Sequence, residues 1–251
     1  MRIQTTTPSP LPLKKLRWEY FVDLIGKAHR TLAEFDDLIT NIKHKEAAFS
    51  LLAQNEALAT SLKGIPSYQS ALLKIAKTSR KTPLSPVFLC KIHKIIRQKS
   101  LSNPVEIGQL RTKQNWIGPE GCTIEEAYFY PPCAKLVQKY MNQLTKYLHY
   151  KEKDPLVQLA IYFAQLLIIH PFMDGNGRLG RALIPLFLYQ KKLTSAPLFY
   201  LSPFFKRHRL QYFEKLFAIT TEEKWEEWIR FFLNGVIEEG RKNIKILSTF
   251  S

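Results

Sequence analysis

The chain has 251 residues and carries 37 Lys and Arg against 21 Asp and Glu, which gives a formal net charge of +16. Hydrophobic residues make up 45% and charged residues 23%, a globular composition that excludes wholesale disorder, and the 10 Gly and 15 Pro exclude collagen-like or linker-rich chains. So large a positive charge favours an anionic partner, such as nucleic acid, an anionic membrane or a phosphorylated small molecule, whereas a lysine-rich surface that only solvates the protein gives the same figure.

The cysteines and the apolar stretches bear on where the protein works. Cys90, Cys122 and Cys133 are an odd number without a CxxC pair, which argues against disulfides and structural zinc and favours a reducing compartment. The N-terminus lacks the apolar core of a signal peptide, and the longest apolar stretch, Leu156–Ile169, is too short to span a bilayer. We therefore expect a soluble cytoplasmic protein that does not enter membranes, and export by a specialised secretion system stays open.

Helical periodicity dominates the first hundred residues. Apolar residues recur at helical intervals in four segments: Leu16–Leu38, Lys45–Leu62, Ser67–Ser79 and Ser85–Gln98. Gly64 is a natural C-terminal cap for the second segment, and Ser85-Pro86 suits the N-cap and first position of the fourth.

The next segment carries the strongest β pattern of the chain. Arg111–Gly118 and Ile124–Tyr130 flank a Pro-Glu-Gly-Cys turn, which predicts a hairpin. Because two strands alone are marginal in water, we expect the hairpin to lie on a helical body, either as a flap or as an accessory loop.

Two apolar helices follow, and both belong in a core. Pro155–Ile169 is apolar on nearly every face, so we expect it at the centre of a bundle. Asp154 begins this helix, and Pro171 ends it because proline disfavours helical geometry in the preceding residue. The remaining helices are predicted at Asn176–Gln190, Arg209–Ala218 and Trp225–Ile246, with Trp225 and Trp228 in the core. The predicted fold is an all-α helical bundle with a small β-hairpin.

The loop between the two apolar helices concentrates the chemistry. Gly175 and Gly177 allow successive backbone N–H groups to form an anion-binding nest, to which the start of the next helix adds its free N–H groups. Arg178 and Arg181 emerge beside this nest, so the segment predicts a polyphosphate cradle. Asp174 is placed to hold Mg²⁺, and the preceding histidine can accept a proton near neutral pH. Together these groups predict phosphoryl or nucleotidyl transfer. For the GNGR string taken alone, the alternative is an ordinary turn followed by solvent-exposed arginines.

At this point the sequence resembles a known family. It matches the signature HPFx(D/E)GNGRxxR of Fic (Fido) proteins at nine specified positions, for which chance has a probability on the order of 10⁻¹⁰ from average residue usage. The matching residues are His170, Pro171, Phe172, Asp174, Gly175, Asn176, Gly177, Arg178 and Arg181. Similar stretches extend over Leu11–Leu233 and imply a Fic fold with three parts, namely residues 1–95 as an N-terminal helical region, 96–234 as the Fic core and 235–251 as a C-terminal end.

The resemblance implies protein AMPylation, in which AMP passes from Mg-ATP to a Ser, Thr or Tyr hydroxyl of a target protein. His170 would then be the general base and Asp174 the ligand of Mg²⁺, with Phe172 buried to anchor the loop. Gly175, Asn176 and Gly177 would form the anion hole, with Arg178 near the α/β-phosphates and Arg181 near the β/γ end. The hairpin, at Trp116, Ile117 and Gly118, would clamp the main chain of the target by strand addition. Tyr212 would stack on adenine, or else it is an ordinary packing tyrosine.

Two positions bear on which reaction occurs and how it is restrained. A related branch with lysine in place of Gly177 transfers phosphate, so the glycine favours AMP transfer, although UMP or another nucleotide stays open. Many long Fic proteins carry an inhibitory glutamate that pairs with the second motif arginine, and here Lys63 stands where that glutamate is expected. We therefore expect Arg181 to lack this partner. Glu56 lies almost two turns earlier, and we do not expect it to reach Arg181.

Partners are less well defined by the sequence. We expect a target protein of unknown identity at the hairpin, no membrane, and no nucleic acid, because the chain ends without the winged-helix domain of many relatives. A homodimer, common among Fic proteins, stays open, as does a basic binding module whose Fic site is unused. The histidines outside the motif are expected on helix faces or in packing: His29, His44, His93, His149 and His208.

Overall fold

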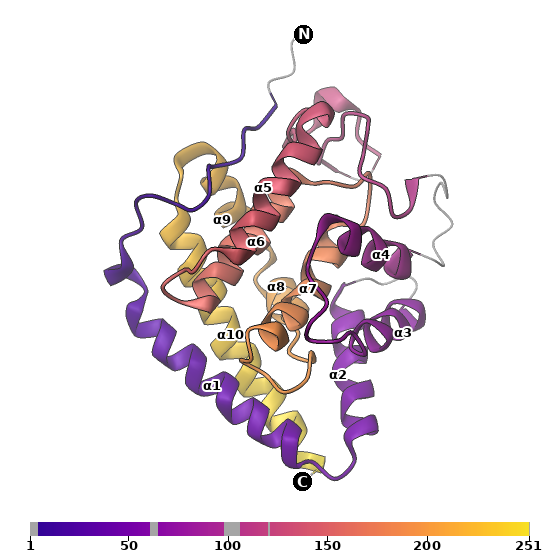
Figure 1. The fold of residues 1–251 in the computed structure, drawn as a ribbon, viewed down its shortest axis with the longest axis vertical. Helices are drawn as coiled ribbons and strands as arrows, with labels where there is room; N and C mark the ends of the chain where they lie inside the picture. The colour runs from indigo at the N-terminus through magenta and orange to yellow at the C-terminus, as the bar shows by residue number, and fades with distance from the viewer. Residues whose placement is uncertain (1–4, 61–64, 98–105, 120, 251) are drawn as a thin grey trace.

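The chain folds into a bundle of α-helices, seen in a computed structural model that describes residues 5–60, 65–97, 106–119 and 121–250 (Figure 1). Within these ranges the α-helices are α1 (Val22–Asn41), α2 (Lys45–Thr60), α3 (Ile65–Ile75), α4 (Pro86–Arg97), α5 (Val137–His149), α6 (Pro155–Ile169), α7 (Asn176–Gln190), α8 (Ser202–Arg207), α9 (Arg209–Glu222) and α10 (Trp225–Leu247). Short 3₁₀ helices lie at Trp18–Tyr20, Ile124–Glu126, Ala134–Leu136 and Ser248–Phe250. The predicted all-α class is confirmed.

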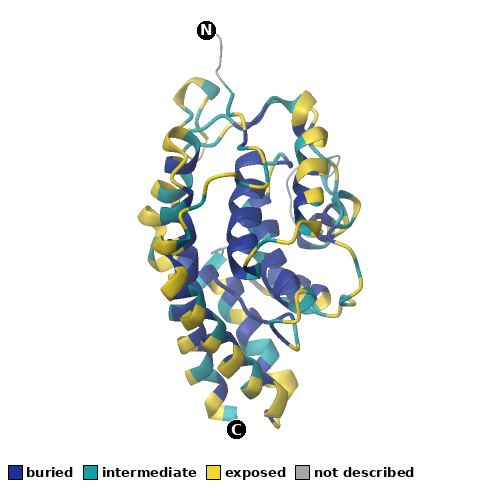
Figure 2. Cartoon of the chain, turned by 60° about the vertical axis from the view of Figure 1, so that its left-hand side comes forward, coloured by how far each residue is buried: buried dark blue, intermediate teal, exposed yellow. Residues whose placement is uncertain are grey.

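Helix α6 is the central element, because every residue from Leu156 to Ile169 is buried (Figure 2). It begins where predicted, since Asp154 Oδ1 accepts the backbone N–H groups of Leu156 and Val157 at 2.8 and 3.1 Å and Pro155 occupies the first helical position. His29 of α1 reaches the other oxygen of Asp154 at 2.7 Å. The start of the central helix is therefore fixed by α1 as well as by its own cap.

The long helices α1 and α10 pack side by side along one flank, and α2, α3 and α4 lie on the other side of the bundle (Figure 1). The Trp228 side chain of α10 is fully buried and donates its indole N–H to Ala160 O of α6 at 2.8 Å. Gly180 of α7 lies against Phe163 of α6, where an added β-carbon would meet the ring at 3.0 Å. The second apolar helix can therefore approach the first closely. Trp225 and Trp228 lie in the core as predicted.

The predicted hairpin is not formed as two strands in the described part of the chain. A single antiparallel bridge joins Ile117 and Phe129. Residues Ile124–Glu126 turn into a 3₁₀ helix because Thr123 and Glu126 form a capping box, each side chain bonding the backbone of the other. This local hydrogen bonding competes with an extended strand. The segment 111–130, called the flap below, is therefore a loop pair pinned by one bridge.

Among the described residues, no helix has both the length and the apolar composition that crossing a membrane requires.

The Asp154 cap yields a test of how the central helix is held. Asp154→Ala removes two cap bonds and the contact to His29, so we expect the free energy of unfolding to drop by about 1–2 kcal/mol. Urea denaturation followed by circular dichroism measures the change. Asp23→Ala is the matched control, because Asp23 is an exposed acid near the start of α1 whose ion pair with Lys27, at 4.0 Å, is exposed too. An equal loss in both variants would contradict the assigned role of the cap.

Candidate active site

The motif loop connects α6 to α7 through two left-handed residues. His170 ends α6 with φ of 49° and Gly175 precedes α7 with φ of 82°. Pro171 explains the left-handed conformation of His170, because proline disfavours helical geometry in the residue before it. Gly175 can adopt its left-handed conformation because it has no β-carbon. The loop therefore leaves one helix and enters the next within six residues, with the first N–H groups of α7 at its end.

Asn176 closes this loop on itself. Its Oδ1 accepts the Phe172 N–H at 2.9 Å and its Nδ2 donates to Phe172 O at 2.7 Å. Both residues are buried, with exposures of 1% and 0%. Phe172 thus lies where the sequence predicts. The Asn176 side chain, in contrast, is fully engaged, so any contribution to an anion site comes from its backbone N–H.

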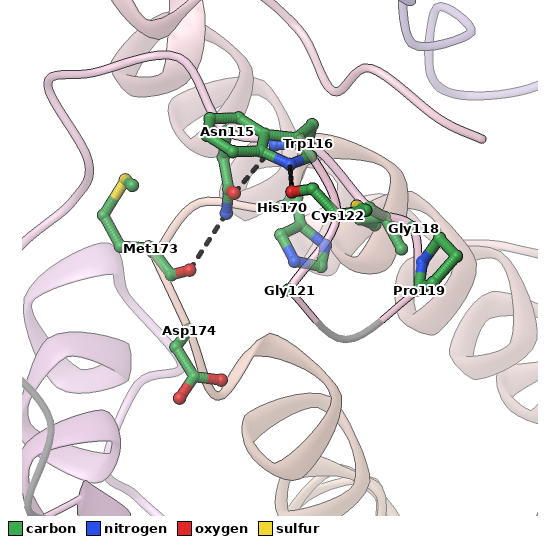
Figure 3. Close-up of a pocket in the computed structure, with 10 residues that line it drawn as sticks. Asn115, Trp116, Gly118, Pro119, Gly121, Cys122, His170, Met173 and Asp174 are labelled. Atoms are coloured by element: carbon green, nitrogen blue, oxygen red, sulfur yellow. Dashed lines mark hydrogen bonds between the residues drawn. The ribbon is translucent and has the colours of Figure 1, made fainter. Parts of the chain in front are cut away.

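The imidazole of His170 lines a cavity of about 360 Å³ between the loop and the flap (Figure 3). Trp116, Ile117, Gly118 and Asp174 line the same cavity, so the structure brings the predicted base, the predicted metal ligand and the predicted docking residues together. The Trp116 indole N–H donates to Cys122 O at 3.2 Å, which holds the tip of the flap.

The protonation of His170 suits a base. Its Nδ1 lies 3.2 Å from Leu167 O, so this nitrogen carries the proton and donates, and Nε2 is left as the basic nitrogen. Burial lowers the pKa of His170 to about 4, and the nearby Arg111 guanidinium acts in the same direction. The imidazole is therefore neutral at physiological pH.

The two motif arginines lie on the first turns of α7. Nη2 of Arg178 lies 3.6 Å from Asp174 Oδ2, and the Arg178 carbonyl accepts the hydroxyl of Tyr68 at 3.1 Å. The Arg181 side chain folds over Gly177, since a β-carbon at that glycine would lie 3.0 Å from Nη1. The Nε of Arg181 is buried and has no hydrogen-bond partner in the described part of the chain. The arginine cradle thus contains a donor that an anion would satisfy.

Tyr212 does not present a free ring face for adenine. It is 7% exposed and packs against Phe205 and Trp228, with ring centroids 4.9 and 6.0 Å apart. Its hydroxyl side faces Arg181, although burial outweighs that cation and raises the pKa of Tyr212 to about 12. Of the two sequence interpretations, the geometry favours the packing tyrosine.

Glu56 of α2 is bound inside the bundle by Ser202. It is fully buried, its Oε2 accepts the Ser202 N–H at 2.9 Å and its Oε1 accepts the Ser202 hydroxyl. Burial raises the pKa of Glu56, and the field of Arg181 opposes that rise, so the two side chains lie within electrostatic range. Among the described residues no ion pair joins Glu56 to Arg181, in agreement with the prediction that Glu56 does not reach it, and the carboxylate is bound by Ser202 instead. Lys63 lies outside the described residues.

Several residues outside the motif hold the loop, and sequence reasoning missed the three described next. Asn115 of the flap donates to Phe172 O and Met173 O at 3.2 and 3.0 Å. Arg111 donates through Nε to His170 O at 2.8 Å. His93 of α4 stacks on the Phe172 ring with centroids 3.9 Å apart.

His93 also bonds to the loop backbone. Its Nδ1 accepts the Gly108 N–H at 3.0 Å, so Nε2 carries the proton and donates to Asp174 O at 2.8 Å. The expectation of ordinary packing for His93 was therefore incomplete. Its 2% exposure and its distance along the chain from the motif leave no sequence signal for this role.

The site and the bundle define a class of protein, a helical protein in which a glycine-bearing helix start lies beside a neutral imidazole. A family model described as Fic/DOC family matches residues 83–188. Over 90 residues the chain is 31% identical to protein adenylyltransferase fic-1 of Caenorhabditis elegans, a stretch covering 35% of this chain and 16% of that protein. The chain thus matches about a sixth of that relative.

Solved structures agree on the fold. A Fic family protein from Desulfovibrio desulfuricans superimposes with a TM-score of 0.74 at 17% identity, over 94% of this chain and 77% of the other. A Fic domain containing signaling protein from Bacteroides thetaiotaomicron gives 0.67 at 15% identity, over 90% and 98%. The family model thus identifies a Fic/DOC-family domain at residues 83–188, and the solved structures show the same fold over most of the chain. The three-part division at residues 95 and 234 stays a prediction.

The lowered pKa of His170 yields a stability test. The unfolded histidine binds a proton below pH 6.5, whereas the folded one does so only near pH 4. Lowering the pH through this window therefore favours the unfolded state, and the loss levels off below about pH 4. We expect the free energy of unfolding of the wild type to fall relative to that of His170→Asn as the pH drops from 6.5 to 4, measured by urea denaturation. The exposed residue His149, changed to Asn, is the control and should track the wild type. A difference in unfolding free energy between wild type and His170→Asn that stays constant with pH would contradict the lowered pKa of His170.

Proposed function

We propose that this protein is a protein adenylyltransferase that transfers AMP from ATP to a Ser, Thr or Tyr hydroxyl of a target protein. The observation that carries the proposal is the neutral His170 imidazole in a cavity that Asp174 also lines, with Arg178 of α7 lying 3.6 Å from the Asp174 carboxylate. The name of the C. elegans relative supports the same chemistry.

The chain's own groups divide the reaction between them. His170 Nε2 accepts the proton of the target hydroxyl as its oxygen attacks the α-phosphorus and pyrophosphate leaves. The first N–H groups of α7, from Asn176 and Gly177, donate to the phosphate oxygens. Arg178 and Arg181 neutralise the rest of the triphosphate, with the buried Nε of Arg181 gaining an acceptor. Proximity and charge stabilisation, rather than covalent chemistry on the enzyme, lower the barrier.

Asp174 fits the role of a single protein ligand for Mg²⁺. Its side chain is 62% exposed at the cavity rim, and Mg²⁺ usually takes one or two carboxylates together with substrate phosphates and water. A Mg²⁺ ion held by Asp174 would supply positive charge that offsets the negative charge of the phosphates.

Gly177 favours AMP transfer over phosphate transfer on steric grounds. Because Arg181 Nη1 lies 3.0 Å from where a β-carbon would stand, a side chain at this position displaces the guanidinium. The glycine thus keeps the arginine over the nest, where it holds the far end of the triphosphate as the leaving group. Transfer of phosphate or of another nucleotide, such as UMP, is the second candidate on the same site.

We propose that the target docks along the flap at Trp116, Ile117 and Gly118. These residues line the cavity that His170 faces, and the bridge to Phe129 keeps the backbone of Ile117 extended. A target segment paired with this backbone would place a hydroxyl side chain over His170.

Labelled ATP tests the reaction. We expect label on protein from [α-³²P]ATP and none from [γ-³²P]ATP, and His170→Ala should abolish the labelling while His149→Ala leaves it unchanged. Mass spectrometry of the protein incubated with Mg-ATP checks for AMP on its own side chains. Label from γ alone would replace AMP transfer by phosphate transfer, and label from neither, in the presence of cell extract as a source of targets, would favour the unused binding module.

Lys63 yields a test of restraint. If the missing inhibitory glutamate leaves Arg181 available to the γ-phosphate, Lys63→Glu should lower labelling several-fold by pairing with Arg181. Lys77→Glu, which reverses an exposed charge shortly after α3, is the control and should have no effect. Equal labelling of Lys63→Glu and wild type would show that this position does not act on Arg181.

A further inference from the structure

Arg97 lies at the C-terminal end of α4 and reaches the motif loop from outside the motif. Its Nη1 lies 2.5 Å from Asp174 Oδ2, and the arginine is 5% exposed. A charge-assisted contact of this length between a buried guanidinium and a carboxylate is a strong one. The nine-position motif does not include this arginine.

The Asp174 carboxylate is engaged on both of its oxygens. Oδ1 accepts the Gly175 N–H at 2.5 Å, and Oδ2 faces Arg97 at 2.5 Å and Arg178 at 3.6 Å. A divalent cation needs oxygen lone pairs and is repelled by a guanidinium at such a distance. Metal binding at Asp174 therefore requires Arg97 to move away from Oδ2.

Arg97 is held in place by the packing of α4 on the loop. A β-carbon at Gly175 would lie 3.1 Å from Arg97 Cδ and 3.2 Å from His93 Nε2, so the loop backbone approaches both side chains closely. The hydrogen bond from His93 to Asp174 O fixes the same stretch of loop one turn earlier on α4. The guanidinium is thus part of a built contact rather than a mobile surface charge.

We propose that Arg97 is a positioning residue that competes with Mg²⁺ for the Asp174 carboxylate and so sets the metal concentration at which the site loads. The assignment of Asp174 to the metal rests on the function proposed above. In the observed arrangement Arg97 takes the place of a cation and keeps the carboxylate oriented. Metal binding displaces the guanidinium from the Asp174 carboxylate. The metal affinity is therefore lower than it would be for a carboxylate without an arginine partner.

The proposal is tested by direct metal binding, with Mn²⁺ as the probe and electron paramagnetic resonance as the readout. Binding is measured with and without α,β-methylene-ATP, so the result does not depend on catalysis. We expect Arg97→Gln to bind Mn²⁺ about tenfold more tightly than wild type in both states, because the competing cation is gone. Lys94→Gln, which removes an exposed cation from the same helix, should leave the affinity unchanged.

A second variant guards against misfolding. Arg97→Met also removes the cation but keeps an unbranched side chain of similar length, and circular dichroism melting identifies the folded variants. Arg97→Lys retains a positive charge without the guanidinium fork and should give an affinity between those of wild type and Arg97→Gln.

Two outcomes separate the possible failures. Unchanged or weaker Mn²⁺ binding in the folded Arg97 variants, with or without nucleotide, would overturn the proposed competition. If α,β-methylene-ATP fails to strengthen Mn²⁺ binding in any protein, the proposed nucleotide function fails, while tighter binding by the nucleotide-free Arg97 variants still supports the role of Arg97.

Discussion

The Arg111 guanidinium, bound to backbone carbonyls, decides where the candidate base lies. It is 4% exposed and donates from Nε to His170 O at 2.8 Å and from Nη2 to Pro132 O at 2.5 Å and Ile169 O at 3.3 Å. These acceptors include the last carbonyls of α6, which have no partner within the helix and would otherwise be buried without one. The same cation acts together with burial in lowering the pKa of His170, so one side chain fixes the position of the imidazole and also favours its neutral form.

The motif supplies the reactive groups, whereas residues far from it supply the geometry. Asn115 and Arg111 on the flap side and His93 on α4 bond to backbone atoms of the loop, so the loop is held from two sides. Inside it, Asn176 ties the loop to itself through Phe172. Such support keeps the α7 N–H groups and Arg178 in place before any ligand arrives, which is the preorganisation that phosphate chemistry needs.

Local signals explain what the sequence could predict. The two central helices match their predicted bounds, because Asp154, Pro155, Pro171 and Gly175 mark their ends by local backbone rules. The flap was predicted as two strands, and the capping box at Thr123 overrides that pattern. The α4 contacts of the loop could not be predicted, because residues about 80 positions apart meet only after the bundle has packed. The choice between adenine stacking and core packing for Tyr212 likewise could not be made from the sequence, because it depends on how α9 packs on α10.

The distribution of charge now separates the two explanations of the +16 surplus. Residues 57–213 hold 23 of the 37 Lys and Arg but only 7 of the 21 Asp and Glu, whereas the remaining 94 residues carry 14 of each. A lysine-rich surface whose only role is solvation would spread its cations over the whole chain, yet α1 and α10 lie in the balanced part. The surplus belongs to the part of the chain that contains the motif, the flap and α4. Under the proposed function, this surplus favours an anionic substrate such as a nucleoside triphosphate, because positive charge speeds the encounter with anions at low ionic strength.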